Sequence, residues 1–104
     1  MIKHMVMWKL KPEAVATEEI FEQNFAKQCE RFRQLQADVP QIRNLEIHKN
    51  FKSGPDFYEF VVIMDFDSRE DLEIFQKSPS HKDPAARAFG QSIRERKAVV
   101  DFEI

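Results

Sequence analysis

Histidines are the side chains of this sequence best suited to acid–base chemistry, and two of the three, His4 and His81, fall where a cavity could form. His81 follows Pro79 and Ser80, a pattern that indicates the first turn of a helix. The positive end of the helix dipole disfavours an imidazolium there, so we expect a neutral ring at physiological pH. A neutral imidazole can accept a proton, as a general base must. The competing interpretation is a histidine that hydrogen-bonds nearby backbone and does no chemistry.

His4 lies on the same face of the first predicted strand as Val6 and Trp8. A lone histidine on an apolar face is more often a satisfied core residue than a ligand. His4 and His81 together are a stronger signal than either alone, because both could open onto one cavity. His48 falls on the second predicted strand, which is expected at an edge of the sheet, and is interpreted as a surface or interface residue.

Metal and phosphate chemistry find no support in the sequence. The three scattered histidines and Cys29 do not have zinc-ligand spacing, and no Gly-rich phosphate loop, nucleophile elbow or H-E-x-x-H motif is present. The acidic pairs Asp65/Asp67 and Glu70/Asp71 are interpreted as solvated turn and cap residues rather than a divalent-cation site. Cys29 lies on an apolar helical stripe and is expected to be an inert core residue.

The elements that must position these residues follow from hydrophobic periodicity. The predicted elements are strands at 2–10, 44–51, 57–66 and 98–104, a long helix at 17–39, and two short helical segments that open near Ser68 and Ser80. The order β-α-β-β-α-β predicts a single α+β, ferredoxin-like domain over residues 1–104. Its four-stranded antiparallel sheet carries the helices on one face, with the first and third strands in the centre.

The predicted sheet is apolar on both faces, although a sheet covered on one side should be polar on the other. The residues expected on the uncovered face are Met5, Met7, Val61, Ile63, Val100 and Phe102. An exposed apolar patch of this extent usually marks an interface, and a second copy packed sheet to sheet is the simplest way to cover it. The alternative is a thick core with some exposed apolar atoms.

Composition excludes several classes of protein. The chain has 104 residues, of which 42% are hydrophobic and 33% charged, and its net charge is −2. These values are typical of a globular domain and not of a disordered chain or a membrane protein. Without a surplus of positive charge, nucleic-acid binding is not expected. A single cysteine excludes an intrachain disulfide, the N-terminus lacks the features of a signal peptide, and a reducing cytoplasm fits both observations.

Three segments of the sequence resemble the stress-responsive A/B barrel domain family, a branch of the dimeric α+β barrel superfamily. They are the opening strand Lys3–Leu10 with its early histidine, the stretch from Phe57 to Gln76, and Ser78-Pro79-Ser80-His81 followed by the closing Val99–Phe102. The resemblance implies a homodimer whose two sheets form one barrel, and it implies no organic cofactor. One plant member is a polyketide cyclase that uses a His and a Tyr, and related branches include cofactor-free monooxygenases and isomerases.

The resemblance places His81 at the catalytic histidine of the cyclase-type members, but the chain departs from their pattern at three positions. Phe75 stands where the cyclase has its partner Tyr, and Phe60 stands where it has a second pocket His. Ser78 replaces the first of the family's two motif histidines. Because phenylalanine can neither give nor take a proton, we do not expect polyketide cyclase activity.

Three functional hypotheses remain open. The first is a homodimeric binding protein that holds a small apolar or aromatic molecule in a pocket between sheet and helices. The expected pocket residues are His4, Val6, Trp8, Phe32, Phe60, Val62, Phe75 and Phe89, with His81. The second is a cofactor-free enzyme, of cyclase, isomerase or monooxygenase type, with His81 as general base. The third is a purely structural or stress-protective dimer with a filled core.

Overall fold

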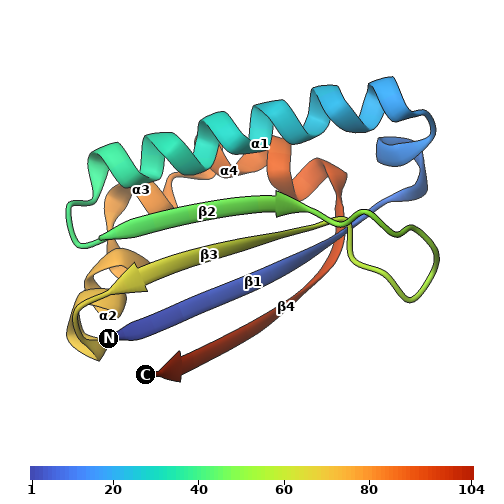
Figure 1. Cartoon of the computed structure of the whole chain (residues 1–104). Helices are drawn as coiled ribbons and strands as arrows, with labels where there is room; N and C mark the ends of the chain where they lie inside the picture. Colours follow the sequence, from blue (N-terminus) through green and yellow to red (C-terminus); the bar gives the residue numbers. More distant parts are fainter.

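Four strands form one antiparallel sheet in the order β2-β3-β1-β4, with the α-helices on one of its faces (Figure 1). The computed structural model describes all residues, 1–104. Its elements are β1 (Ile2–Leu10), η1 (Pro12–Val15), α1 (Glu18–Asp38), β2 (Asn44–Lys49), β3 (Phe60–Phe66), α2 (Arg69–Lys77), α3 (Pro79–Lys82), α4 (Pro84–Ile93) and β4 (Arg94–Glu103). The predicted ferredoxin-like topology, with the first and third strands central, is confirmed.

Side-chain caps fix where the helices begin. The hydroxyl oxygens of Thr17 and Ser68 accept hydrogen bonds from backbone N–H groups of the first turns of α1 and α2. The segment expected to open near Ser80 is two helices, α3 capped by Ser78 and α4 capped by Asp83. In both cases a proline follows the cap, at a position where a helix needs no N–H donor. None of the helices is both long and apolar enough to span a membrane.

The core lies between the sheet and the helices. The strands contribute Ile2, Trp8, Leu10, Phe60, Val62, Met64 and Phe66, and the helices contribute Leu35, Leu72, Phe75 and Ile93, among other buried residues. Cys29 of α1 is also buried, and desolvation raises the pKa of its thiol. The burial expected for this cysteine is observed.

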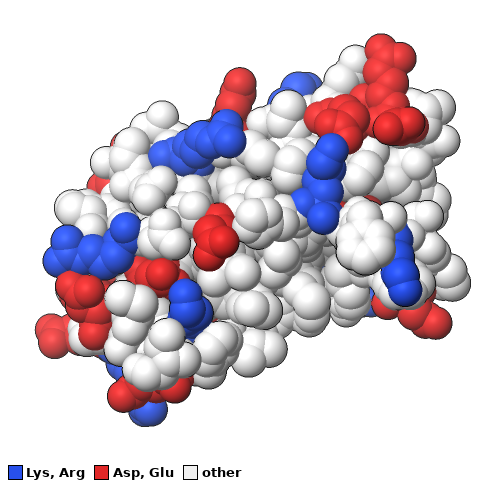
Figure 2. Space-filling view, viewed as in Figure 1, with Lys and Arg blue, Asp and Glu red and all other residues white.

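The other face of the sheet has no helix over it. Residues directly opposite each other on neighbouring strands share a face, and Met5 pairs with Ile63 on one side and Val100 on the other. The six apolar residues expected on this face all lie on it. Val100, one of the six, is 51% exposed. Figure 2 shows a mostly uncharged area over β3, β1 and β4, with charged side chains toward its ends and acidic atoms over β2.

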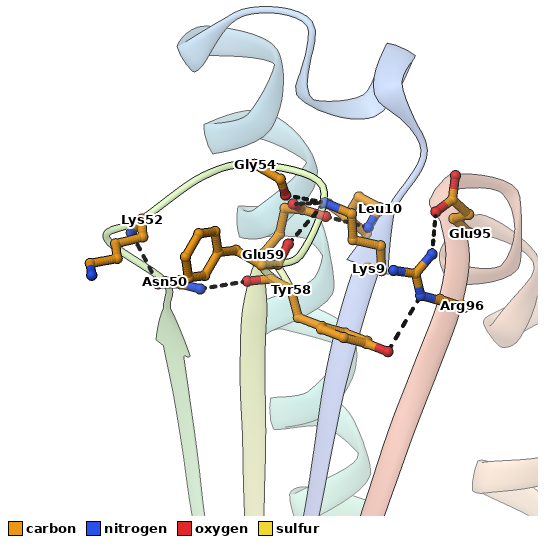
Figure 3. A network of polar contacts seen from close by, with 10 residues as sticks. Lys9, Leu10, Asn50, Lys52, Gly54, Tyr58, Glu59, Glu95 and Arg96 are labelled. Atoms are coloured by element: carbon orange, nitrogen blue, oxygen red, sulfur yellow. Dashed lines mark hydrogen bonds and ion pairs between the residues drawn. The ribbon is translucent and has the colours of Figure 1, made fainter.

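The loop between β2 and β3 is anchored by Lys9 at the end of β1 (Figure 3). The Lys9 ammonium donates to the carbonyl oxygens of Gly54 and Phe57, at 3.0 and 2.8 Å, and to Glu59 Oε2 at 3.0 Å. Glu59 also accepts from the backbone N–H of Leu10. The expected first residues of β3 are instead bonded to side chains, since the Phe57 carbonyl accepts from Lys9 and the Tyr58 carbonyl from the Asn50 amide, and β3 starts at residue 60.

The last strand begins earlier than predicted. β4 starts at Arg94, directly after α4 ends at Ile93, whereas its hydrophobic pattern begins only at Ala98. The first four residues of the strand are Arg-Glu-Arg-Lys, so their apolar content gives no strand signal. Their pairing with β1 forms the strand, and it brings two of these cations to the cavity described next.

Candidate functional site

A cavity of about 190 Å³ lies between the sheet and helices α1, α2, α3 and α4, and it opens partly to solvent. Seven of the residues predicted from the sequence line it: His4, Val6, Trp8, Phe32, Val62, Phe75 and His81. The structure thus brings both candidate histidines, which are 77 positions apart in the chain (81 minus 4), to one space. Strands β1 and β3 form its floor and the helices form its walls.

Phe60 and Phe89 were expected in the pocket but do not line it. Phe60 is fully buried between Trp8 and Phe25, with ring centroids 5.3 and 5.5 Å away, so it packs beside the cavity on the same face of the sheet as Trp8. Phe89 lies on a side of α4 that faces Lys27 of α1, whose ammonium is 4.8 Å from the ring centroid. Both positions follow from side-chain direction, which the hydrophobic pattern does not resolve.

His81 occupies the single turn of α3. Its backbone N–H donates to the hydroxyl oxygen of the cap Ser78, and its ring makes no hydrogen bond to the protein. Burial, followed by the charges of the nearby cations Arg87, Arg31 and Lys97, lowers the pKa of His81 from its usual value to about 4. The ring is therefore neutral at physiological pH, as predicted, although burial and neighbouring cations are the cause and not the helix dipole.

His4 is held by a carboxylate that the sequence did not single out. Asp101 of β4 is the direct cross-strand neighbour of His4, and its Oδ1 contacts His4 Nδ1. An ionised carboxylate only accepts hydrogen bonds, so Nδ1 carries the proton and Nε2 is the free acceptor of a neutral ring. Every fully buried side-chain nitrogen and oxygen of the chain has a partner. Nε2 has none, and so it is open to the cavity.

Phe75 of α2 separates the two histidines. Its ring centroid lies 6.2 Å from that of His4 and 4.5 Å from that of His81. The position where cyclase-type members are expected to carry a Tyr therefore holds an apolar ring in contact with both imidazoles. No hydroxyl group can relay a proton between them at this point.

Sequence reasoning missed the polar wall of the cavity. Gln28 and Arg31 precede Phe32 and Leu35 at the same helical spacing on α1, and all four line the cavity. Arg87, Gly90, Gln91 and Arg94 repeat the same spacing at α4, while Lys97 and Val99 come from the helix-facing side of β4. The signal was present, because polar residues that keep the register of an apolar stripe point toward the same space.

No group of three or more His, Cys, Asp and Glu side chains lies close enough together to hold a metal ion. The two cavity histidines are separated by the Phe75 ring, and Asp101 is the one carboxylate in contact with either of them. The polar groups that line the cavity are thus two imidazoles, three glutamine amides and four cations, beside an aromatic and aliphatic floor. This set can bind, orient and exchange protons.

We compared this chain with the models of known protein families. The model of the stress responsive A/B barrel domain family matches residues 2–104. The chain belongs to this family. The resemblance found in the sequence is therefore confirmed over residues 2–104 of the chain. A comparison with curated protein sequences finds no match.

Solved structures share the fold of this A/B barrel domain at low sequence identity. A dimeric protein of unknown function from Bacteroides fragilis is 24% identical with a TM-score of 0.79, and the match covers 99% of this chain and 95% of that one. A member of the family from Mesorhizobium loti is 18% identical with a TM-score of 0.73 over 99% and 95%. A hydroxynitrile lyase from Passiflora edulis is 18% identical with a TM-score of 0.69 over 99% and 92%. At these identities the likeness establishes the ferredoxin-like fold.

Proposed function

We propose that this A/B barrel domain protein is a homodimer in which each subunit binds a small, mostly apolar or aromatic molecule between its sheet and helices. The observation that carries the proposal is the cavity of about 190 Å³, floored by Val6 and Trp8 and walled by Phe32 and Phe75. An engineered apolar cavity of about 150 Å³ holds benzene, so there is room for one ring with a short substituent. A cytoplasmic protein with no organic cofactor fits this proposal.

The dimer part of the proposal is supported by the uncovered apolar face of the sheet. Two such faces packed together would bury Met5, Met7, Val61 and Ile63 and close the two sheets into a barrel. Structures that share the fold include proteins described as dimeric. The cavity and the uncovered face lie on opposite sides of the sheet, so dimerisation leaves the cavity accessible.

Native mass spectrometry and a matched pair of variants test the proposal. We expect a dimer, and we expect phenol or benzyl alcohol to raise the melting temperature by mass action. Ala86 lines the cavity, whereas Ala88 of the same helix faces solvent. Ala86→Leu should fill the space and abolish the shift, and Ala88→Leu should retain it. A clean monomer, or no shift in the wild-type protein with any small aromatic, contradicts the proposal.

A cofactor-free enzyme is the second candidate, and the His4–Asp101 pair favours it. The sequence pointed to His81 as general base, but a pKa of about 4 makes that ring a weak proton acceptor at neutral pH. His4 has a fixed tautomer with Nε2 open to the cavity, the arrangement in which a carboxylate orients a base. A hydroxynitrile lyase shares the fold, which is consistent with catalysis on this scaffold.

Deuterium exchange decides whether the cavity contains a general base, and whether that base is His4 or His81. A base in the cavity should take a proton from the methyl carbon of acetophenone and return deuterium from D₂O, which NMR detects as loss of the methyl signal. Catalysed exchange that His4→Gln abolishes and His81→Gln retains assigns the base to His4, and the reverse pattern assigns it to His81. Exchange no faster than in buffer alone removes the enzyme candidate.

A further inference from the structure

The wall of the cavity has a one-sided charge. Arg31, Arg87, Arg94 and Lys97 all line it, and no Asp or Glu does. The chain as a whole has more acidic than basic residues, with 18 against 16. A random sample of its side chains would therefore be slightly acidic, so four cations without a carboxylate at one cavity are a local concentration of positive charge.

These four cations are not neutralised by ion pairs. None of them has a carboxylate oxygen within 4.0 Å, although seven other Lys or Arg side chains form ion pairs in the chain. Arg31 Nη2 donates to the carbonyl oxygen of Ser80 at 2.6 Å, and the Arg94 guanidinium lies 4.9 Å from the Trp8 ring centroid. Both contacts place the cations at the cavity without cancelling their charge.

The cations also repel each other. Desolvation lowers the pKa values of Arg94 and Lys97, and the charge of Arg87 lowers both further. Desolvation and Arg87 likewise lower the pKa of Arg31, against opposing contributions from the carboxylates of Asp83 and Asp38. The positive charges at the cavity wall thus oppose one another, and a bound anion would relieve this repulsion.

An independent feature of the same wall is the side chain of Gln28. This residue is only 2% exposed, yet its amide makes no hydrogen bond within the protein. Because every fully buried side-chain nitrogen and oxygen has a partner, the amide must reach the cavity space. A buried amide without a protein partner is a donor and acceptor prepared for a ligand or a water molecule.

We propose that the cavity is an anion site and that its ligand is a small aromatic carboxylate. The carboxylate would lie among Arg87, Arg94 and Lys97 with the Gln28 amide, and the ring on the apolar floor formed by Trp8 and Phe75. This inference rests on the proposed binding function and narrows its ligand to an acid. It excludes neutral aromatics of equal size as the preferred occupants.

Isothermal titration calorimetry with benzoate and benzyl alcohol at pH 7 tests the inference, since the two probes differ little in shape and by one charge. We expect benzoate to bind at least about tenfold more tightly, with an affinity that decreases as NaCl is added. Lys97→Gln and Arg87→Gln should each weaken benzoate about tenfold and leave benzyl alcohol unchanged. Lys82→Gln is the control, because Lys82 is exposed on α3 and outside the cavity wall.

The possible failures are distinct. If benzyl alcohol binds as tightly as benzoate, the pocket stands and the assignment of an acidic ligand is wrong. If neither probe binds, the binding function itself is wrong and this inference with it. If Lys82→Gln weakens benzoate as much as Lys97→Gln, or Ala86→Leu leaves benzoate unchanged, the anion binds to the surface and the inference is also overturned.

Discussion

At the scale of single residues, the Lys9–Glu59 ion pair joins the end of β1 to the loop between β2 and β3. Both side chains are almost fully buried, and each ammonium proton of Lys9 has an oxygen partner. A buried charge pair gives little net stability compared with apolar residues, but the loss of one partner leaves an uncompensated buried charge. The pair therefore specifies the path of the loop between β2 and β3.

Lys9→Met should lower the free energy of unfolding by about 3–5 kcal/mol, because Glu59 would remain buried without its cation. Lys77→Met is the matched control, since Lys77 pairs with Glu73 on the exposed surface of α2 and should change stability by less than about 1 kcal/mol. Urea unfolding measures both. Adding Glu59→Gln to Lys9→Met should recover part of the loss, and equal effects of the two Lys→Met changes contradict the argument.

His81 gives the stability a pH dependence that can be isolated. Its pKa is about 4 in the folded chain and about 6.5 when unfolded, so the unfolded chain binds the extra proton between these values. Stability should fall as pH decreases from about 6.5 to about 4. Urea unfolding at pH 7 and pH 5 should show a smaller fall for His81→Gln than for wild type, whereas the exposed His48→Gln should behave as wild type. An identical fall in all three proteins contradicts the low pKa.

At the scale of elements, α4 approaches the sheet closely at Gly90. A Cβ atom at this position would lie 2.8 Å from Trp8 Cη2 and 3.2 Å from the amide atoms of Gln28. Gly90 thus lets α4 pack against the side chains that form the floor and wall of the cavity. Glycine lowers the intrinsic stability of the helix at this position, but it allows the close contact with Trp8 and Gln28.

Gly90→Ala should reverse the usual sign of this substitution. In an ordinary helix interior the change stabilises by about 0.5–1 kcal/mol, whereas here the new methyl group must displace Trp8 or Gln28. We expect a lower melting temperature and weaker binding of any cavity ligand. Ala88→Gly, at an exposed position of the same helix, should lose only about 1 kcal/mol and leave binding intact. A stabilised Gly90→Ala variant contradicts the close packing.

Periodicity could predict most of these elements because it reports burial directly. Strands β1 and β3 and helix α1 have regular apolar patterns, and their positions were predictable within a few residues. The start of β4 was not, since Arg94 to Lys97 are polar and join the sheet through backbone pairing. The same limit applies to the site. Its apolar lining was predictable, and helical spacing also carried the signal for Arg31 and Arg87, but Asp101 and Lys97 depend on the register of β4 against β1, which a single sequence does not reveal.

At the scale of the whole molecule, the two faces of the sheet have separate roles. The face under the helices holds the cavity, and the opposite face is apolar in its centre. Charged side chains lie at the ends of that second face (Figure 2), including the Lys3–Asp65 pair. A polar rim around an apolar centre is the usual anatomy of a protein interface.

Val100→Lys should convert the proposed dimer to a monomer, because it places an unpaired charge within the sheet-to-sheet contact. Ile74→Lys is a matched control: Ile74 is a β-branched residue of α2 that is 42% exposed, and it lies away from that face. Sedimentation velocity should show a monomer for the first variant and a dimer for the second. Two dimers, or two monomers, contradict the proposed interface.

The rate at which a thiol reagent modifies the buried Cys29 can report transient openings of the structure. Its thiol is shielded in α1 and its raised pKa keeps the reactive thiolate scarce, so a thiol reagent can modify it only when α1 transiently separates from the sheet. The rate of modification then reports how often these openings occur, and no fluorophore has to be attached. A molecule that occupies the cavity bridges α1 and the sheet and should slow the modification. Wild-type protein thereby reports its own occupancy, and a panel of acids can be ranked by mass spectrometry alone.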